Sequence, residues 1–155
     1  MEKKPRILCV VGPTACGKTK MGVLLARRYD GEVVSVDSMQ IYRGMTIGTA
    51  APTEAEMEGV PHHMVAVADP AESWSAARFA READRCVQDI LARGRLPVLV
   101  GGTGLYFQAL LRGIADIPPL DPAIGARLEA RLDAEGAPAL HAELRKATRS
   151  MRRAS

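Results

Sequence analysis

Residues 12–19, GPTACGKT, match the pattern G-x-x-x-x-G-K-[ST] at every fixed position. The match lies between an apolar run at residues 6–11 and an amphipathic helical pattern at residues 18–29, which is the context that the pattern requires. In such a loop, successive backbone N–H groups wrap a diphosphate, and the helix that follows adds its partial positive charge. The sequence therefore predicts a phosphate-binding loop, although kinases, GTPases, motors and transferases all share it.

Every residue of this loop is a candidate contact for phosphate. Glycine permits positive φ and close approach of a ligand to the backbone, Lys18 supplies a full positive charge, and the Thr19 hydroxyl can bind Mg²⁺. Cys16 is interpreted as a small loop-filling residue, because a redox role needs evidence of exposure and a lowered thiol pKa. The predicted diphosphate-binding residues are Gly12, Pro13, Thr14, Ala15, Cys16, Gly17, Lys18 and Thr19, with Thr19 as the metal ligand.

A second group of polar residues, Asp37-Ser38-Met39-Gln40, directly follows the apolar run at residues 32–36. In an open α/β sheet, residues just past the carboxyl ends of the strands line the ligand crevice, so Asp37 is expected to face the phosphate-binding loop. There it could act as a general base or bind Mg²⁺ through water. The alternative is that Asp37 caps a turn or a helix.

A third group, Gly101-Gly102-Thr103-Gly104, follows the apolar run at residues 96–100. Two glycines before a hydroxyl at a strand end suggest backbone folded close to a ligand, with Thr103 aimed at it. A tight turn that simply needs glycine is the alternative. No Asp ends this run, so the carboxylate of an ATP-hydrolysing machine is missing.

The adjacent residues His62 and His63 are of a type that binds metal ions, but their spacing does not suit a shared metal site. Neighbouring side chains in an extended segment point to opposite sides, so the two rings are not expected to bind one ion. A substrate-positioning role for one of the histidines stays open.

Apolar runs alternate with helical patterns along most of the chain. Strands are predicted at residues 6–11, 32–36, 63–68 and 96–100, and helices at 18–29, 75–93 and 105–111. In the first helix, Met21, Leu24, Leu25 and the stem of Arg28 are expected on the inward face. Strands that alternate with helices predict an α/β fold, a P-loop-type parallel sheet covered by helices on both faces.

The character of the sequence changes at Ile117. Three prolines up to Pro122 make a stiff connection, and two charged Ala/Leu-rich helical patterns follow, separated by Gly136 and Pro138. We therefore predict an incomplete α/β core at residues 1–116, and at 117–155 the start of a helical insertion with an irregular tail. The last ten residues, KATRSMRRAS, have no apolar period.

Composition excludes several classes of protein. Apolar residues make up 47% and charged residues 25%, and 21 basic against 18 acidic residues give a net charge of only +3. This is a globular composition that permits an anionic partner without requiring one. No run of residues is long enough to span a membrane, and the start of the chain is not a secretory signal. The three widely spaced cysteines fit a reduced, cytoplasmic compartment.

The motifs together resemble one family, the tRNA dimethylallyltransferases, also called tRNA isopentenyltransferases. The segments that carry the resemblance are GPTACGKT, DSMQIYRGMTIGTA, PHHMV, WSAARF, GRLPVLVGGTGLYFQALLRGI and PPLDP, in the family's order. The resemblance extends from about residue 6 to about residue 146. It implies transfer of a dimethylallyl group from dimethylallyl diphosphate to N6 of the adenine 3′ of the anticodon in tRNA.

The resemblance also implies roles for individual residues. The loop at residues 12–19 would hold a prenyl diphosphate instead of a nucleotide, with Mg²⁺ at Thr19. Asp37 would take the proton from N6, and Thr103 would lie between the tRNA and diphosphate sites. The tRNA-binding residues implied are Asp37, Ser38, Met39, Gln40, Thr103 and Arg127.

The chain departs from the family pattern in several places. Family members commonly have Asp at the position of Thr46, Lys at that of Ala51 and Arg at that of Gly125, where Arg127 is a candidate substitute. The family also continues well beyond residue 146, so we expect the helical segment to be incomplete, through either truncation or a frameshift. We therefore expect weak or no activity from this chain alone. We also expect the chain to be a monomer.

Two other functions stay open on the sequence alone. A small ATP-dependent phosphotransferase would share the loop, the size and the parallel sheet, although no arginine-bearing lid is evident. A non-catalytic remnant that binds tRNA or another anion is the other possibility, and a salt-sensitive tRNA affinity without turnover would indicate it.

Overall fold

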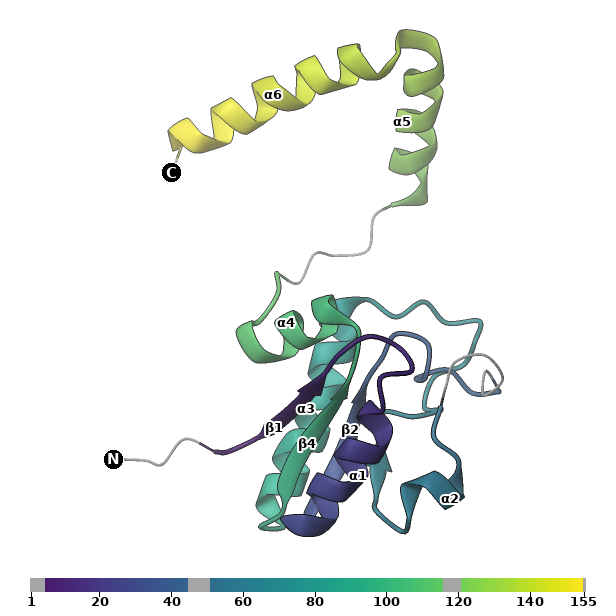
Figure 1. Ribbon diagram of the computed structural model, residues 1–155. Coiled ribbons are helices and arrows are strands. Elements are labelled where there is room, and N and C mark those ends of the chain that lie inside the picture. The colour runs from purple at the N-terminus through teal and green to yellow at the C-terminus, as the bar shows by residue number, and fades with distance from the viewer. Residues whose placement is uncertain (1–4, 45–50, 116–120, 155) are drawn as a thin grey trace. The chain divides into compact units, whose positions relative to one another are not determined.

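A four-stranded parallel sheet forms the centre of the part of the chain that the computed structural model describes, residues 5–44, 51–115 and 121–154. The strands are β1 (Leu8–Val11), β2 (Gly31–Val36), β3 (His62–His63) and β4 (Leu96–Gly101), and they lie in the order β1-β4-β2-β3. β4 therefore pairs with both β1 and β2, with Leu99 opposite Cys9 on one side and Val34 on the other. The carboxyl ends of β1, β2 and β4 consequently meet at one edge of the sheet (Figure 1).

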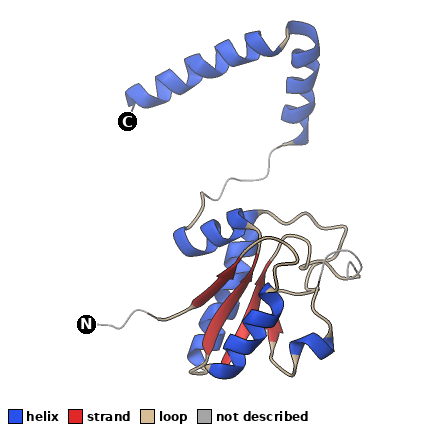
Figure 2. Ribbon diagram, viewed as in Figure 1, coloured by secondary structure: helices blue, strands red, loops and turns tan. Residues whose placement is uncertain are grey.

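Helices cover both faces of this sheet, as the alternation of strands and helices predicts (Figure 2). The helices of this part are α1 (Lys18–Arg28), α2 (Glu54–Met57), α3 (Ala76–Ala92) and α4 (Gly104–Arg112). On one face, Val34 and Val36 of β2 pack with Phe79 and Ile90 of α3. On the other face, Val33 packs with residues of α1. The alternation of side chains along β2 thus supplies two separate cores, which confirms the predicted fold class.

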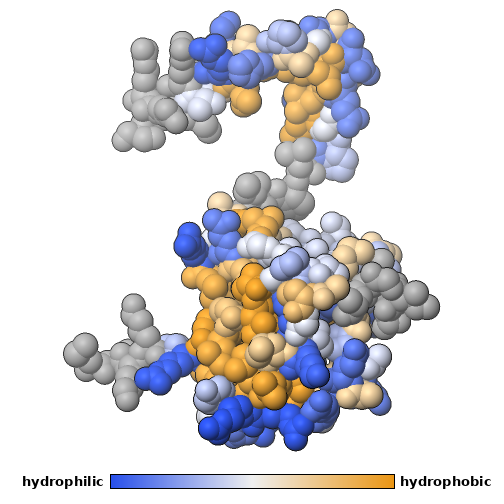
Figure 3. Space-filling model, viewed as in Figure 1, coloured by the Kyte–Doolittle hydropathy of each residue, from blue (hydrophilic) through white to orange (hydrophobic). Residues whose placement is uncertain are grey.

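The inward face of α1 differs from the prediction. Gly22, Val23 and Ala26 are buried, whereas Leu24 is 63% exposed and Met21 49% exposed. The reason is the close approach of the helix to the sheet, since a Cβ on Gly22 would lie 2.5 Å from Cγ2 of Val100. Small residues therefore face the strands, and larger apolar side chains remain on the surface over α1 and β1 (Figure 3).

The third strand is much shorter than the predicted residues 63–68. β3 contains only His62 and His63, because Met64 and Ala66 have positive φ values of 61° and 51° that break the extended backbone. After Met64 the backbone instead bonds to the turn that follows β2, with Ala66 N donating to Gln40 O at 2.9 Å. This contact anchors the turn that carries Asp37 and Gln40.

The helix α3 begins and ends as its sequence predicts. Ser75 is the N-cap, and its hydroxyl oxygen accepts from Arg78 N at 3.1 Å. Gly94, with φ of 74°, lies just past the end of the helix.

The chain divides into two compact units, Met1–Asp116 and Ile117–Ser155. The second unit contains α5 (Pro122–Glu135) and α6 (Ala137–Ala154). Arg131 of α5 joins the two helices by an ion pair with Glu143 of α6, and it also pairs with Glu135 within α5. The irregular tail predicted for the end of the chain is wrong, because α6 continues to Ala154. Lys, Ala, Arg and Met all favour the helix, so an apolar period is not needed there. None of the described helices has the length and apolar character to cross a membrane.

Candidate active site

The phosphate-binding loop connects β1 to α1, as predicted. Gly17 is the N-cap of α1 and has φ of 84°, and Ala15 also has a positive φ of 63°. Gly12 is needed for a different reason, because a Cβ there would lie 2.9 Å from Sγ of Cys16. The two fixed glycines of the pattern therefore have different roles: Gly17 adopts a left-handed backbone, and Gly12 allows close packing inside the loop.

Lys18 folds back across this loop. Its Nζ donates to the carbonyl oxygen of Pro13 and lies 3.9 Å from Sγ of Cys16. An ammonium group has three donors, so the bond to Pro13 leaves donors for an anion. Lys18 thus bridges the loop through Pro13 and also lines the cavity beside it.

A cavity of about 370 Å³ opens beside the loop. It brings together five of the eight predicted loop residues with Asp37 and Gln40, which come from the turn after β2. Phosphate-binding groups and a carboxylate therefore face one space. The lining residues are Thr14, Ala15, Gly17, Lys18, Thr19, Lys20, Asp37, Gln40, Ala51, Glu56, Val100 and Gly101.

Asp37 both faces this cavity and stabilises its own turn. Its Oδ1 accepts from the backbone N–H groups of Met39 at 2.8 Å and Gln40 at 3.2 Å. A carboxylate has about four acceptor positions, so these two bonds leave capacity for a substrate proton or a metal-bound water. The two roles considered for Asp37, turn cap and cavity base, are therefore compatible in one geometry.

Thr103 lies at the N-cap position of α4 and is joined to the Asp37 turn. Its Oγ1 accepts from Ser38 N at 3.1 Å and donates to Ser38 Oγ at 3.5 Å. The structure thus brings Thr103 and Ser38 together, while Met39 lies on the same turn with an exposed side chain. Neither Thr103, Ser38 nor Met39 belongs to the lining of the cavity itself.

The glycines before Thr103 are explained by packing between backbones. A Cβ on Gly101 would lie 2.0 Å from the carbonyl oxygen of Val36, and one on Gly102 would lie 3.1 Å from that of Gly12. Glycine here lets the end of β4 approach β2 and the phosphate-binding loop. Close packing of backbones, which neither of the two interpretations made from the sequence contains, therefore explains these two glycines.

Four lining residues were not singled out as site residues from the sequence: Lys20, Ala51, Glu56 and Val100. Glu56 had a detectable signal, because Thr53 and Glu56 form a capping box at the start of α2. Nothing in the sequence, however, indicates that Glu56 lines the same cavity as the phosphate-binding loop. Thr46 lies outside the described residues, and Arg127 lies exposed on α5 of the second unit.

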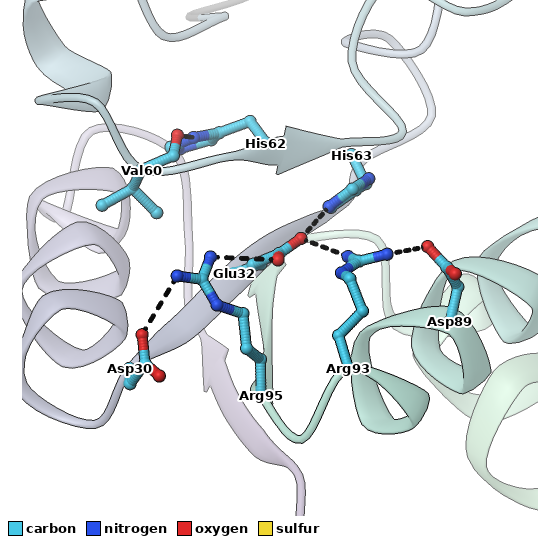
Figure 4. A network of polar contacts seen from close by, with 8 residues as sticks. All are labelled: Asp30, Glu32, Val60, His62, His63, Asp89, Arg93 and Arg95. Atoms are coloured by element: carbon cyan, nitrogen blue, oxygen red, sulfur yellow. Dashed lines mark hydrogen bonds and ion pairs between the residues drawn. The ribbon is translucent and has the colours of Figure 1, made fainter.

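The adjacent histidines point to different partners (Figure 4). His62 Nδ1 bonds the carbonyl oxygen of Val60 at 2.8 Å, and His63 Nε2 bonds Oε2 of Glu32 at 2.6 Å. Burial lowers the pKa of His62, with a smaller contribution from His63. Among the described residues, no group of three His, Cys, Asp or Glu side chains is arranged to hold a metal ion.

Glu32 is the centre of a polar cluster at the opposite end of the sheet from the phosphate-binding loop. Its side chain is only 4% exposed and also accepts from Arg93 at 2.7 Å and Arg95 at 3.2 Å. Burial raises the pKa of Glu32, but the bonds from His63, Arg95 and Arg93 outweigh it, so the net pKa lies below its ordinary value. This cluster joins β2, β3 and the connection between α3 and β4.

We expect Glu32→Gln to destabilise the fold by about 1–3 kcal/mol at pH 7, because two arginines and His63 lose a buried charged partner. Since the folded-state pKa is depressed, the contribution of Glu32 is present above an unfolded pKa of about 4.3 and is lost as pH falls through the folded value. Urea unfolding should therefore show a difference in the free energy of unfolding between variant and wild type at neutral pH, and this difference should shrink at acid pH.

Asp30→Asn is the matched control for this measurement. Asp30 pairs with the same Arg95 at 3.2 Å, but its side chain is 81% exposed. An exposed pair contributes little, so this variant should unfold within about 0.5 kcal/mol of wild type. Equal losses in the two variants would contradict a role for the burial of Glu32.

A parallel sheet with a phosphate-binding loop between β1 and α1, and a carboxylate at the end of β2 in the same cavity, defines a P-loop protein. The family model described as IPP transferase matches residues 40–154, and that of isopentenyl transferase matches residues 5–67. The chain belongs to the IPP transferase family. The resemblance seen in its sequence motifs is thereby confirmed.

Individual relatives agree with this assignment. A tRNA dimethylallyltransferase of Anaeromyxobacter sp. (strain Fw109-5) is 54% identical over 139 residues, which cover 90% of this chain and 46% of the relative. The solved structure of the full-length tRNA isopentenylpyrophosphate transferase of Bacillus halodurans is 47% identical, with a TM-score of 0.71. The match covers 98% of this chain and 50% of the Bacillus halodurans chain. A eukaryotic dimethylallyltransferase acting on tRNA is 32% identical, with a TM-score of 0.70, covering 77% of this chain and 31% of its own. The chain spans about half the length of its bacterial relatives.

Proposed function

We propose that this chain provides the diphosphate-binding and adenine-binding part of a tRNA prenyltransferase. The reaction is transfer of a dimethylallyl group from dimethylallyl diphosphate to N6 of the adenine 3′ of the anticodon. The observation that carries the proposal is that Lys18, Thr19 and Asp37 line the same cavity. The names of the relatives support both tRNA as the acceptor and a dimethylallyl donor.

In the proposed reaction, N6 attacks the allylic carbon, and the bond from that carbon to the diphosphate oxygen breaks. The electron pair of the broken bond leaves with the diphosphate, so negative charge grows on the leaving group. Lys18 and the N–H groups at the start of α1 stabilise that charge, and Asp37 accepts the proton that N6 loses. The residues therefore divide between leaving-group stabilisation and proton removal.

Mg²⁺ fits the donors present in this cavity. Thr19 offers a hydroxyl and Asp37 a carboxylate, and both are hard oxygen ligands. Mg²⁺ in proteins keeps several waters and is often held by one or two side chains together with substrate phosphates. When bound, the ion would neutralise charge on the leaving diphosphate, and Thr19 is the proposed protein ligand.

Mass analysis of an RNA hairpin tests this proposal. Because weak or no activity is expected from this chain alone, a full-length chimera completed from a relative is incubated with Mg²⁺, dimethylallyl diphosphate and an anticodon stem-loop. The expected product carries one dimethylallyl group on the adenine. A hairpin with guanine at that position should stay unmodified. A parallel titration compares dimethylallyl diphosphate with ATP, and a clear preference for ATP would favour a phosphotransferase and overturn the proposal.

A further inference from the structure

Ser35 is a buried polar residue in an otherwise apolar stretch of β2. It lies between Val34 and Val36, opposite Val100 of β4, and is only 3% exposed. A buried hydroxyl is costly unless it forms a hydrogen bond. Ser35 meets this requirement with one side chain, because its Oγ donates to Oε1 of Gln40 at 2.8 Å.

This bond completes a set of contacts that fix Gln40. Its backbone N–H donates to Oδ1 of Asp37 at 3.2 Å, and its carbonyl oxygen accepts from Ala66 N at 2.9 Å. The backbone of Gln40 is therefore held relative to Asp37, and the bond from Ser35 fixes the direction of the side-chain oxygen Oε1. Without the hydroxyl, this oxygen loses a buried donor that holds it in place.

Gln40 separates Ser35 from the candidate active site. Gln40 lines the main cavity together with Asp37 and Lys18. Ser35 instead lines a smaller neighbouring cavity that Gln40 also borders. Ser35 can therefore influence a molecule in the main cavity through Gln40.

We propose that Ser35 is a positioning residue, which orients the Gln40 amide toward the base of the acceptor adenosine. This inference rests on the proposed function and names the residue that sets base recognition. An amide has two donor hydrogens and two acceptor lone pairs, and the bond from Ser35 occupies one of these four positions. Glutamine is well suited to an adenine edge, and a fixed amide holds N6 within reach of Asp37.

The test measures the binding affinity of the chain for two anticodon stem-loops, one with adenine and one with guanine at the target position. The preference is the ratio of the two affinities. Losing one orienting hydrogen bond in Ser35→Ala should lower this preference about 3- to 10-fold. Affinity for dimethylallyl diphosphate should stay within twofold of wild type. Ser35 shares the smaller cavity with Thr19, but its hydroxyl bonds Gln40 and, among the described residues, no residue of the phosphate-binding loop. Ser35→Thr keeps the hydroxyl, so this variant should have the same preference for adenine as wild type.

A double-mutant cycle distinguishes positioning from a general structural effect. Gln40→Met removes the amide and keeps the approximate size of the side chain. If Ser35 acts through Gln40, then Ser35→Ala should cause no further loss of preference in the Gln40→Met background. Equal losses in both backgrounds would overturn the inference, and this comparison holds even if Ser35→Thr does not fold.

The experiment also separates this inference from the proposed function. If wild type binds both dimethylallyl diphosphate and the adenine hairpin, but Ser35→Ala has the wild-type preference, only the role of Ser35 is wrong. If wild type binds neither molecule, the proposed function is wrong and the role of Ser35 falls with it. Thermal unfolding of each variant shows that a folded protein was measured.

Discussion

Replacing Lys18 by alanine should weaken the binding of dimethylallyl diphosphate at least about 100-fold while the fold stays intact. Lys18 is the first residue of α1, and its Nζ crosses the loop to the carbonyl oxygen of Pro13. Its replacement removes a full positive charge and the charge-assisted hydrogen bonds to phosphate, each worth about 1.5–3 kcal/mol. Isothermal titration calorimetry with dimethylallyl diphosphate measures the loss.

Lys20→Ala is the matched control for Lys18→Ala. Lys20 lines the same cavity, but its exposed side chain makes no bond to the loop among the described residues. It should therefore weaken binding far less, about threefold, as expected for a solvent-screened charge. Equal effects of the two variants would indicate general attraction of anions in place of a specific Lys18 contact, and circular dichroism checks that both variants keep their helices.

The parts of the fold that follow from local rules could be predicted from the sequence. The phosphate-binding loop needs a defined backbone within eight residues, so its motif is sufficient to place it. Ser75 and Gly94 mark the ends of α3 because capping depends on immediate neighbours. The class of fold follows in the same way from strands that alternate with helices.

Other features depend on contacts between distant residues and could not be predicted. The inward face of α1 is set by the close approach of Gly22 to Val100, which the apolar pattern of the helix does not contain. Glu56 reaches the cavity because α2 contacts α1, the helix that follows the phosphate-binding loop. The bond from Ser35 to Gln40 likewise needs β2 and the turn after it in three dimensions.

The end of β3 illustrates a further limit of pattern reading. Residues 63–68 form a mostly apolar run, which is typical of a buried strand, yet the positive φ values of Met64 and Ala66 turn the chain away from β2. The bonds of Ala66 and Val67 go instead to Gln40 and Ile41. The apolar pattern is real, but the residues serve to hold the turn of the candidate active site.

Asp37→Asn should lower the chemical step by about 10²–10⁴-fold, the range typical of a general base. An adenine amino group is a weak nucleophile that becomes acidic only as its bond to carbon forms, so a carboxylate beside N6 is needed at that moment. Asparagine cannot accept this proton. The diphosphate contacts of Lys18 and Thr19 are untouched, so affinity for dimethylallyl diphosphate should stay unchanged.

The structure shows why this substitution distinguishes the two roles considered for Asp37, general base and turn cap. Oδ1 of Asp37 accepts from the N–H groups of Met39 and Gln40, and the amide oxygen of asparagine can accept from both in the same way. If Asp37 were only a turn cap, the rate would therefore barely change, since Asn caps about as well as Asp. Single-turnover kinetics, in a full-length chimera completed from a relative, measures the step. A rate within about threefold of wild type, well below the range for a general base, would remove Asp37 from the mechanism.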